Sequence, residues 1–580
     1  MPMPVHAFRG GASVLRKHWK LVGLGVGVLL ATQIYRKYNR KRRIQQRKDE
    51  VKKSCARLRQ QLQNDGINEA KSKVITDLSI TQLQSKLQNG ELKAIDVLRA
   101  YQYKALEVND KTNCIVEPIK EAEVWARELD NQTGPKGKLH GIPISIKECY
   151  SIKGYFVTAG MSYFLDKVVD DDAVLVKVIK AAGAIPFVRT NIPQTMMTFE
   201  CSNPLYGITT NPHDSTRSPG GSSGGEGALI GGGGSLLGIG GDIGGSIRIP
   251  CHMCGIVGLK PTEQRLSLNG SLSINTGQTH VKPSGGPMAN SVDGVVLAMK
   301  VLLDDTQFIL DPFVPPLKFN TQVYESKVPL RIGYYTDNGI ITPVPACVRA
   351  VHEAKQALEK LGHIMVPFSP PDVHAAVARY TRTVLAERCD VAAGLLADDE
   401  IDRSYMLMYH TYQTLPTILR MFFGLLMKTQ DSLAGEVVSQ RRIWAMLDWW
   451  DLYDEITAYK SKFIQHWRDM NLDAVISPGF ACPALPTFKS LEVSTVLSYT
   501  VLWNLLNFPA GSVPVTKVTE NDQKQLNDAD FYPAKKAFER KLREFCQNGV
   551  GLPVNVQCIA LPYQEEVVLR LMKEIETNTK

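Results

Sequence analysis

The sequence lacks the features of fibrous, disordered and disulfide-rich proteins. It has no collagen-like period, no coiled-coil bias, no internal repeat and no long low-complexity tract. Its 11 cysteines are scattered and odd in number, which suits reduced thiols better than a disulfide framework. The composition, 44% hydrophobic and 22% charged, is that of a globular chain, and 580 residues can bury a large core. We therefore exclude a fibre, a wholly disordered chain and a small secreted scaffold.

The sequence also lacks the common metal and nucleotide motifs. Cys251 and Cys254 form its only CxxC, with no second pair to complete a zinc site and no histidine in the haem-attachment position. We expect both thiols to lie in the core. The most glycine-rich stretch contains neither the P-loop pattern nor the dinucleotide-binding fingerprint. The sequence therefore predicts no metal and no cofactor.

Acidic residues are scarce at the N-terminus. The first 60 residues contain 16 Lys and Arg against two acids, so they carry +14, and the other 520 residues carry −5 of the total +9. A protein body that binds nucleic acid should carry its basic excess on the folded surface. We therefore expect no nucleic-acid partner.

An uncharged run of 15 residues, 21–35, lies inside this basic arm. A membrane-spanning helix needs about 20 apolar residues, but snorkelling of Lys20 and Arg36 would let the run cross a thin bilayer. Basic residues follow the run where a signal peptide would have a cleavage site. There are eight Lys and Arg in 36–48 against four in 9–20, which predicts a single-pass anchor with a cytoplasmic body. A buried or interfacial helix is the alternative.

Periodicity after the arm predicts alternating helices and strands. Residues 79–108 have the pattern of two amphipathic helices with a break at Asn89-Gly90. Residues 141–147 read as a half-buried strand because their isoleucines alternate, and 184–190 read as a second strand. Residues 172–182, between them, have helical spacing. Units of this kind predict an α/β fold with a parallel or mixed sheet.

Residues 219–258 hold 16 of the 45 glycines. A folded protein uses glycine at this density where the backbone passes close to something or takes a positive φ. Apolar residues interleave with these glycines, which favours a site-forming region over a flexible linker. Residues 220–224 also match G-x-S-x-G, the nucleophile elbow of α/β-hydrolases, but none of the 11 histidines lies in an evident late active-site loop.

The chemistry available in this region is that of serine and lysine. Ser222 lies between glycine pairs, and Gly244-Gly245-Ser246 offers consecutive N–H groups with little side-chain obstruction. Lys147 ends the strand predicted over 141–147. A serine that attacks a carbonyl needs a base and oxyanion donors, and a lysine kept neutral by burial can be that base.

Four separated motifs together resemble the amidase-signature family of serine hydrolases. They are GIPISIK at 141–147, GGSSGGEG at 220–227, GDIGGSIRIP at 241–250 and GIVGLKPT at 255–262. The flanking segments 79–105, 508–515 and 551–576 are also similar, so the resemblance spans about 75–578. It implies an α/β amidase-signature fold, in which helices sandwich a large mixed central sheet. It also divides the chain into an anchor with a basic flank (1–50), a helical connector (51–78) and a catalytic domain (79–578).

The resemblance implies a Ser-Ser-Lys triad. Ser246 would be the nucleophile, Lys147 the base, and Ser222 the hydroxyl that relays protons between them, with an unusual cis peptide beside it. Ser223 would support this network. The sequence departs from the family at Gly241, where members usually carry Thr or Ser. A supporting hydroxyl is therefore missing beside the loop that leads to Ser246, and we expect lowered activity at worst.

The resemblance also implies a substrate-binding set. The N–H groups of Ile243, Gly244, Gly245 and Ser246 would bind the oxyanion, and Met196 would lie near the substrate carbonyl. Ile243, the segment 201–205 and the N-terminal anchor are most similar to the membrane-bound branch of the family, which hydrolyses fatty-acid amides.

A second apolar segment, 404–428, bears on the substrate class. It is broken at Pro416 and carries only Arg420 as a charge between its ends, and each half is too short to span a bilayer. It is either a buried helical hairpin or an apolar membrane-binding cap beside a substrate entrance, and the resemblance favours the cap. Three tryptophans that follow at near-helical spacing are expected in the core, with interfacial anchoring as the alternative: Trp444, Trp449 and Trp450.

The sequence thus predicts a membrane-bound serine hydrolase. It would cleave N-acyl ethanolamines, primary fatty-acid amides and esters to fatty acid and amine, with lipid amide and the bilayer as partners. An amidase for small soluble amides and a catalytically silent membrane scaffold are the alternatives. The resemblance alone implies a homodimer and the endoplasmic reticulum membrane.

Overall fold

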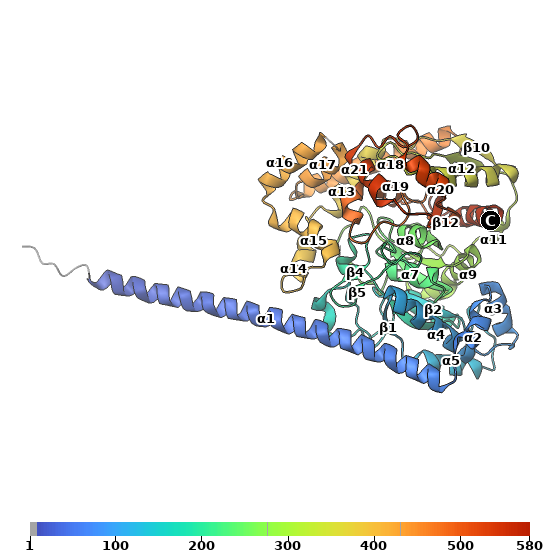
Figure 1. The fold of residues 1–580 in the computed structure, drawn as a ribbon, viewed down its shortest axis with the longest axis horizontal. Helices are drawn as coiled ribbons and strands as arrows, with labels where there is room; N and C mark the ends of the chain where they lie inside the picture. Colours follow the sequence, from blue (N-terminus) through green and yellow to red (C-terminus); the bar gives the residue numbers. More distant parts are fainter. Residues whose placement is uncertain (1–8, 275–276, 430, 580) are drawn as a thin grey trace, which may run out of the picture.

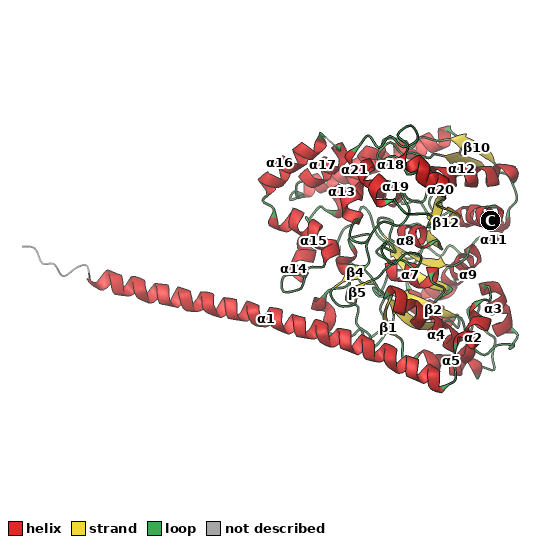
Figure 2. Ribbon diagram, in the orientation of Figure 1, coloured by secondary structure: helices red, strands yellow, loops and turns green. Residues whose placement is uncertain are grey.

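The computed structural model describes residues 9–274, 277–429 and 431–579, without the side chains of 9–27, 29 and 30. Strands run through the middle of the body with helices outside them, and the long helix α1 extends beyond the body at its N-terminal end (Figures 1 and 2). Two sheets are present among these residues, one of eleven strands and one of two.

The strands are β1 (Ile115–Pro118), β2 (Pro143–Lys147), β3 (Ile185–Thr190), β4 (Ser202–Asn203), β5 (Gly207–Ile208), β6 (Leu237–Asp242), β7 (Val257–Lys260), β8 (Ser284–Ala289), β9 (Arg331–Tyr334), β10 (Ile364–Pro367), β11 (Ala474–Pro478), β12 (Ala510–Lys517) and β13 (Pro553–Ala560). The first eleven α-helices are α1 (Arg9–Asn64), α2 (Glu69–Thr76), α3 (Ile80–Gln88), α4 (Ala94–Thr112), α5 (Ala122–Asp130), α6 (Val174–Ala181), α7 (Gly224–Gly231), α8 (Arg248–Cys254), α9 (Val292–Leu302), α10 (Asp305–Leu310) and α11 (Thr321–Glu325). The others are α12 (Pro345–Lys360), α13 (Val373–Val384), α14 (Asp390–Leu395), α15 (Arg403–Tyr409), α16 (Thr417–Lys428), α17 (Ser432–Ser439), α18 (Met446–Asp469), α19 (Ser498–Leu506), α20 (Glu520–Asn527), α21 (Ala537–Phe545) and α22 (Glu565–Asn578). Short 3₁₀ segments are η1 (Ser162–Asp166), η2 (Gln194–Met196) and η4 (Ser490–Leu497), and η3 (His410–Thr414) is a π-helical turn.

The large sheet is mixed, as the sequence predicts. Its order is β1-β3-β2-β6-β8-β7-β12-β13-β11-β9-β10. Strand β2 pairs in parallel with β3 and β6, and β9 pairs in parallel with β10 and β11. The other neighbours are antiparallel. The α/β fold with a large mixed central sheet is therefore confirmed.

Helices cover both faces of the sheet. A Cβ on Gly511 of β12 would contact Met572 of α22, whereas a Cβ on Gly258 of β7 would contact Cys251 of α8. Gly258 pairs with Ser512, the residue after Gly511, so these contacts lie on opposite faces. This double cover corrects the prediction of a half-buried strand over 141–147, because every residue of β2 is buried.

The local helix signals agree with the structure. The predicted pair over 79–108 is present as α3 and α4, and Ser79 forms a capping box with Gln82 at the start of α3. Strand β3 and helix α6 also lie where the periodicity predicts them. Cys251 and Cys254 are buried in the core. The glycine-rich stretch forms β6, α7 and α8, so it is not a linker.

Helix α1 is continuous across the predicted boundary between residues 50 and 51. Its C-terminal half packs on the body through Ile44, Leu58 and Leu62, and Arg47 pairs with Glu117 of β1. No helix in the described parts of the chain is long and apolar enough to cross a membrane. The predicted transmembrane helix over 21–35 is therefore unsupported, because 15 helical residues rise only about 22 Å against roughly 30 Å of hydrocarbon.

The tryptophans after the apolar segment differ from the prediction of core packing. Trp444 and Trp450 are exposed, and only Trp449 packs inward, stacked on His280. The buried stripe of α18 includes Leu452 and Ile456 at helical spacing, and Trp450 falls off that stripe. The expectation for Trp444 and Trp450 was wrong because a spacing read from three residues did not locate the buried face.

A close backbone approach in α7 generates a stability prediction. A Cβ on Gly225 would lie 2.2 Å from the backbone nitrogen of Asn191, so Gly225→Ala must displace main chain. We expect it to cost about 3 kcal/mol of unfolding free energy and to lower the thermal midpoint by several degrees. Gly394→Ala, where a Cβ meets nothing within 4 Å, is the control. Equal midpoints for the two variants would contradict the prediction.

Candidate active site

The candidate site lies where two parallel strands end. Strands β2 and β6 pair in parallel and end at Lys147 and Asp242, so their carboxyl ends share one edge of the sheet. Ser222 precedes the start of α7, and Ser246 precedes the start of α8. Both serines therefore have the same local structure, since each lies in a glycine-rich turn that leads into a helix N-terminus.

Lys147 and Ser222 are in direct contact. The Lys147 Nζ lies 2.7 Å from Ser222 Oγ and 3.4 Å from the carbonyl oxygen of Gly241. The lysine side chain is buried, and no described carboxylate is close enough to form an ion pair with it. Burial lowers the pKa of Lys147, which favours the neutral amine that can accept a proton. The partner of Ser222 is thus a lysine rather than the histidine that a nucleophile elbow requires.

A buried carboxyl group joins the elements that carry these two residues. Glu226 of α7 accepts hydrogen bonds from Ser145 Oγ of β2 at 2.5 Å and from Thr190 Oγ1 of β3 at 2.7 Å. Burial raises the pKa of Glu226 to about 7. This contact holds the first turn of α7 against the strand that ends at Lys147.

Ser246 lies close to the other two residues, but its side chain makes no hydrogen bond to any described residue. The Ser223 N–H donates to the carbonyl oxygen of Ser246 at 3.1 Å, which joins the two glycine-rich turns, and the Gly221-Ser222 peptide is cis. Ser246, Ser222 and Lys147 line one small pocket. Within the described residues, Ser246 Oγ has no hydrogen-bond partner, so it is free to face a substrate.

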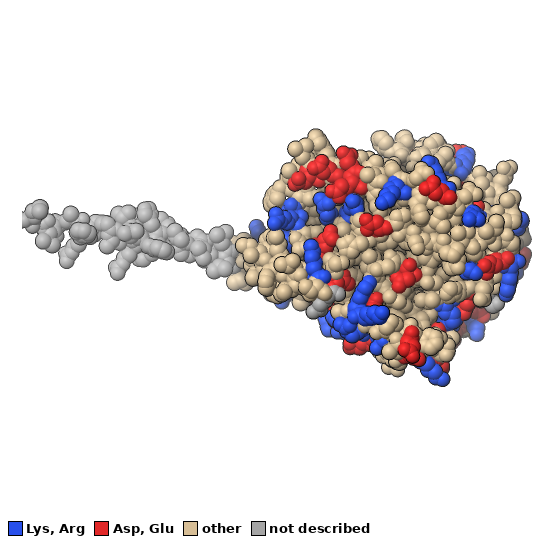
Figure 3. Space-filling view, turned by 90° about the horizontal axis from the view of Figure 1, so that it is seen from above, with Lys and Arg blue, Asp and Glu red and all other residues tan. Residues whose placement is uncertain are grey.

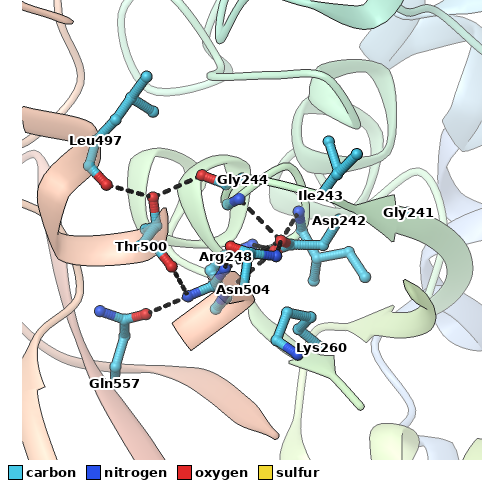
Figure 4. A network of polar contacts seen from close by, with 12 residues as sticks. Gly241, Asp242, Ile243, Gly244, Arg248, Lys260, Leu497, Thr500, Asn504 and Gln557 are labelled. Atoms are coloured by element: carbon cyan, nitrogen blue, oxygen red, sulfur yellow. Dashed lines mark hydrogen bonds and ion pairs between the residues drawn. The ribbon is translucent and has the colours of Figure 1, made fainter. Parts of the chain in front are cut away.

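A buried carboxylate organises the loop before Ser246 (Figure 4). Asp242 accepts from the N–H groups of Gly245 at 2.8 Å and Ile247 at 3.1 Å, and from Asn504 Nδ2 at 2.9 Å. The Arg248 guanidinium donates to both carboxylate oxygens. Burial acts to raise the pKa of Asp242, but the attraction of Arg248 outweighs it and holds this pKa below its ordinary value. The loop is therefore built around a permanent negative charge.

The four predicted oxyanion donors differ in availability. The Gly245 N–H is committed to Asp242, whereas those of Ile243, Gly244 and Ser246 make no hydrogen bond to any residue in the described ranges. Three N–H groups in the loop before α8 are thus available to bind an anion.

Two cavities meet at Ser246. The larger, about 660 Å³, has a mainly apolar wall, and the smaller, about 70 Å³, is lined by Lys147, Ser222 and Ser246 among others. They share four lining residues: Met196, Met197, Ile243 and Ser246. A carbonyl carbon placed at Ser246 would have one substituent in each cavity.

Sequence reasoning missed the partners that hold the loop. Thr500 and Asn504 of α19 and Gln557 of β13 belong to this network, and the Asp242–Asn504 contact spans 262 residues. Asp242 and Arg248 lay within the motif 241–250, but their pairing was not predicted. No signal in a single sequence reports a contact at such a separation.

Comparisons with known proteins show the family to which the chain belongs. A family model described as Amidase matches residues 96–569. Fatty-acid amide hydrolase 1 of Sus scrofa is 40% identical over 516 residues, 89% of this chain and 87% of that protein. Fatty acid amide hydrolase 1 of Caenorhabditis elegans is 37% identical over 545 residues, 92% and 93% of the two chains. A solved structure described as fatty acid amide hydrolase has a TM-score of 0.76 at 26% identity, covering 94% of this chain and 95% of that chain. The chain therefore belongs to the amidase family and is an amide hydrolase.

Proposed function

We propose that this protein hydrolyses long-chain fatty-acid amides, among them N-acyl ethanolamines and primary amides, and also the corresponding esters. The large apolar cavity that ends at Ser246 is the observation that carries the proposal, since its volume falls in the range of ligand pockets and its wall suits an acyl chain. The names of the two relatives support the same substrate class. The small pocket beside Lys147 suits a compact amine.

The proposed mechanism uses the triad as a proton relay. Neutral Lys147 takes a proton from Ser222 as Ser222 takes one from Ser246, and the Ser246 oxygen attacks the amide carbonyl. The free N–H groups of Ile243, Gly244 and Ser246 stabilise the tetrahedral oxyanion. The relay then runs in reverse and protonates the leaving nitrogen, and water hydrolyses the acyl-enzyme by the same route.

We infer that α16 binds the membrane and admits the substrate. The exposed apolar side chains of α16 include Ile418 at 82% and Phe422 at 55% exposure. Arg420 is buried and donates to the carbonyl oxygen of Val438, so the exposed charge of α16 is confined to Lys428 at its C-terminal end. Phe423 is both exposed and part of the cavity wall, which favours an entrance at this helix. Figure 3 shows both basic and acidic side chains distributed over one face of the body.

The alternatives make different demands. An amidase for small soluble amides would share the triad, but its substrates would not require a 660 Å³ apolar cavity beside an exposed apolar helix. A catalytically silent scaffold would not require a buried lysine in contact with a serine hydroxyl. Turnover of short against long acyl amides, with and without detergent, separates the first alternative from the proposal. The endoplasmic reticulum location stays a prediction.

Loss of the nucleophile tests the proposal directly. We expect the full chain to release fatty acid from long-chain amides and Ser246→Ala to lower kcat by at least about 10³-fold. A fluorophosphonate probe should label the unmodified protein and not the variant. Persistent labelling of Ser246→Ala would contradict the assignment of the nucleophile, and failure of the unmodified protein to react would favour the scaffold.

Removal of the base should produce a selective and pH-dependent defect. Because burial lowers the pKa of Lys147, kcat/KM for an amide should rise with pH through an ionisation below the ordinary lysine value of 10.5. Lys147→Ala should remove this rise and lower kcat/KM for the amide on the order of 10³-fold. The loss of kcat/KM for the ester should be smaller, because an amine leaves only when it is protonated. Lys86→Ala, at an exposed ion-paired lysine, is the control. Equal losses for amide and ester would contradict the relay.

Charges placed on α16 should weaken membrane binding. We expect Ile418→Glu with Phe422→Glu to lower binding to phospholipid vesicles at least about ten-fold, because two exposed apolar side chains that the membrane would bury are lost from the contact. The matched control is Ile309→Glu with Phe313→Glu, at residues 78% and 87% exposed outside this helix. Co-sedimentation measures both, and equal losses would exclude α16 as the contact.

A further inference from the structure

We propose that Tyr380 and Thr500 are positioning residues for the oxyanion hole. Each donates a hydroxyl hydrogen to one of two successive carbonyl groups in the loop 242–246, and this fixes which N–H groups of the loop are free. The inference rests on the proposed function, since it takes Ser246 as the nucleophile.

Tyr380 sets the first peptide unit. Its hydroxyl donates to the carbonyl oxygen of Ile243 at 3.1 Å. In a trans peptide the C=O and N–H point in opposite directions, so the Gly244 N–H points away from this hydroxyl. A Cβ on Gly244 would lie 2.4 Å from the Tyr380 oxygen, so the phenol lies directly against the loop. The Gly244 N–H, which has no partner among the described residues, is thereby held in one orientation.

Thr500 sets the second peptide unit. Its Oγ1 donates to the carbonyl oxygen of Gly244 at 2.7 Å, and the N–H of the same peptide unit donates to Asp242 at 2.8 Å. Both ends of the Gly244–Gly245 peptide are therefore fixed. Gly245 has φ +121°, and a Cβ there would lie 2.6 Å from Thr500 Oγ1, so the chain passes this hydroxyl too closely for any other residue.

The third carbonyl of the loop is held by the helix that follows. The Gly245 carbonyl accepts from the Ile249 N–H at 2.7 Å, in the first turn of α8. The three carbonyls of residues 243, 244 and 245 thus have three separate donors. The result is an alternation in which the N–H of Gly244 is free, that of Gly245 is bound, and that of Ser246 is free.

Thr500 is itself fixed in place. Its carbonyl oxygen accepts from Arg248 Nη1 at 3.0 Å, and the same guanidinium binds Asp242 (Figure 4). The Thr500 hydroxyl has a second acceptor in range, Leu497 O, at 3.1 Å. Its single hydrogen serves one acceptor at a time, and the shorter contact is to Gly244. The hydroxyl is therefore committed to the loop rather than to its own helix.

The test uses the full-length protein and variants that remove single hydroxyl groups. Tyr380→Phe and Thr500→Val delete the two donors, and Thr500→Ser keeps one. The controls are Tyr459→Phe and Thr383→Val, which remove buried hydroxyls that donate to the carbonyls of Pro371 and Arg379; neither residue lines either of the two cavities. For each protein we would measure kcat and KM for a long-chain primary amide, and the affinity for a trifluoromethyl ketone with the same chain, which forms an oxyanion at Ser246.

We expect Tyr380→Phe and Thr500→Val each to lower kcat about ten-fold with KM within two-fold of the parent. This loss is smaller than the 10²–10³-fold effect of losing an oxyanion donor outright, because the N–H group is displaced rather than removed. The ketone should lose affinity by the same factor as kcat/KM. Thr500→Ser and both controls should stay near the parent.

Two results would overturn the proposal. One is a parental kcat and ketone affinity in both Tyr380→Phe and Thr500→Val, and the other is an equal loss in the controls or in Thr500→Ser. If Thr500→Val fails to fold, Tyr380→Phe, which deletes one oxygen, decides alone. A parent that labels with a fluorophosphonate at Ser246 but cleaves no fatty amide would refute the proposed substrate class, and the labelling rate would then report on the loop.

Discussion

The structure of the site depends on one buried carboxylate. Asp242 ends a central strand, and its two oxygens accept hydrogen bonds from the loop, from Arg248 and from Asn504. A charge this deep is tolerated only when its partners are complete, and removal of one partner from such a pair typically costs about 3–5 kcal/mol. Because the same carboxylate binds the Gly245 N–H and the start of α8, the position of Ser246 follows from the position of this charge.

Local signals in the sequence predicted local structure well. The amphipathic pattern over 79–108 and the break at Asn89-Gly90 located α3 and α4, and the alternating isoleucines located β2 and placed Lys147 at its end. Burial was harder to predict, because it depends on what covers an element. The same alternation that fits a half-buried strand also fits β2, which lies between two helical layers, and nothing in the spacing of Trp450 reveals the buried stripe of α18.

The site was predictable only where its residues share a motif. Lys147, Ser222 and Ser246 were identified from three motifs that resemble one family, and the structure brings Lys147 against Ser222 and all three to one pocket. Tyr380 and Thr500 come from helices far along the chain, and nothing in their own sequence surroundings indicates a contact with the loop. At Gly241, where a hydroxyl was missing, a Cβ would have only ordinary contacts, the nearest being Tyr150 Oη at 3.6 Å. Space therefore does not require the glycine, and the loop takes its hydroxyl contacts from α13 and α19 instead.

Helix α16 bears on the kinetics because it is a single layer between the outer surface and the cavity. Ile418 and Phe422 are exposed on it, while Phe423, Leu426 and Met427 line the cavity that leads to Ser246. On the entry route proposed above, a substrate would pass from the lipid through this wall without first equilibrating with bulk water. The quantity that sets the encounter rate is then its mole fraction in the surface, so inert lipid or detergent added at fixed total substrate slows turnover by dilution in two dimensions.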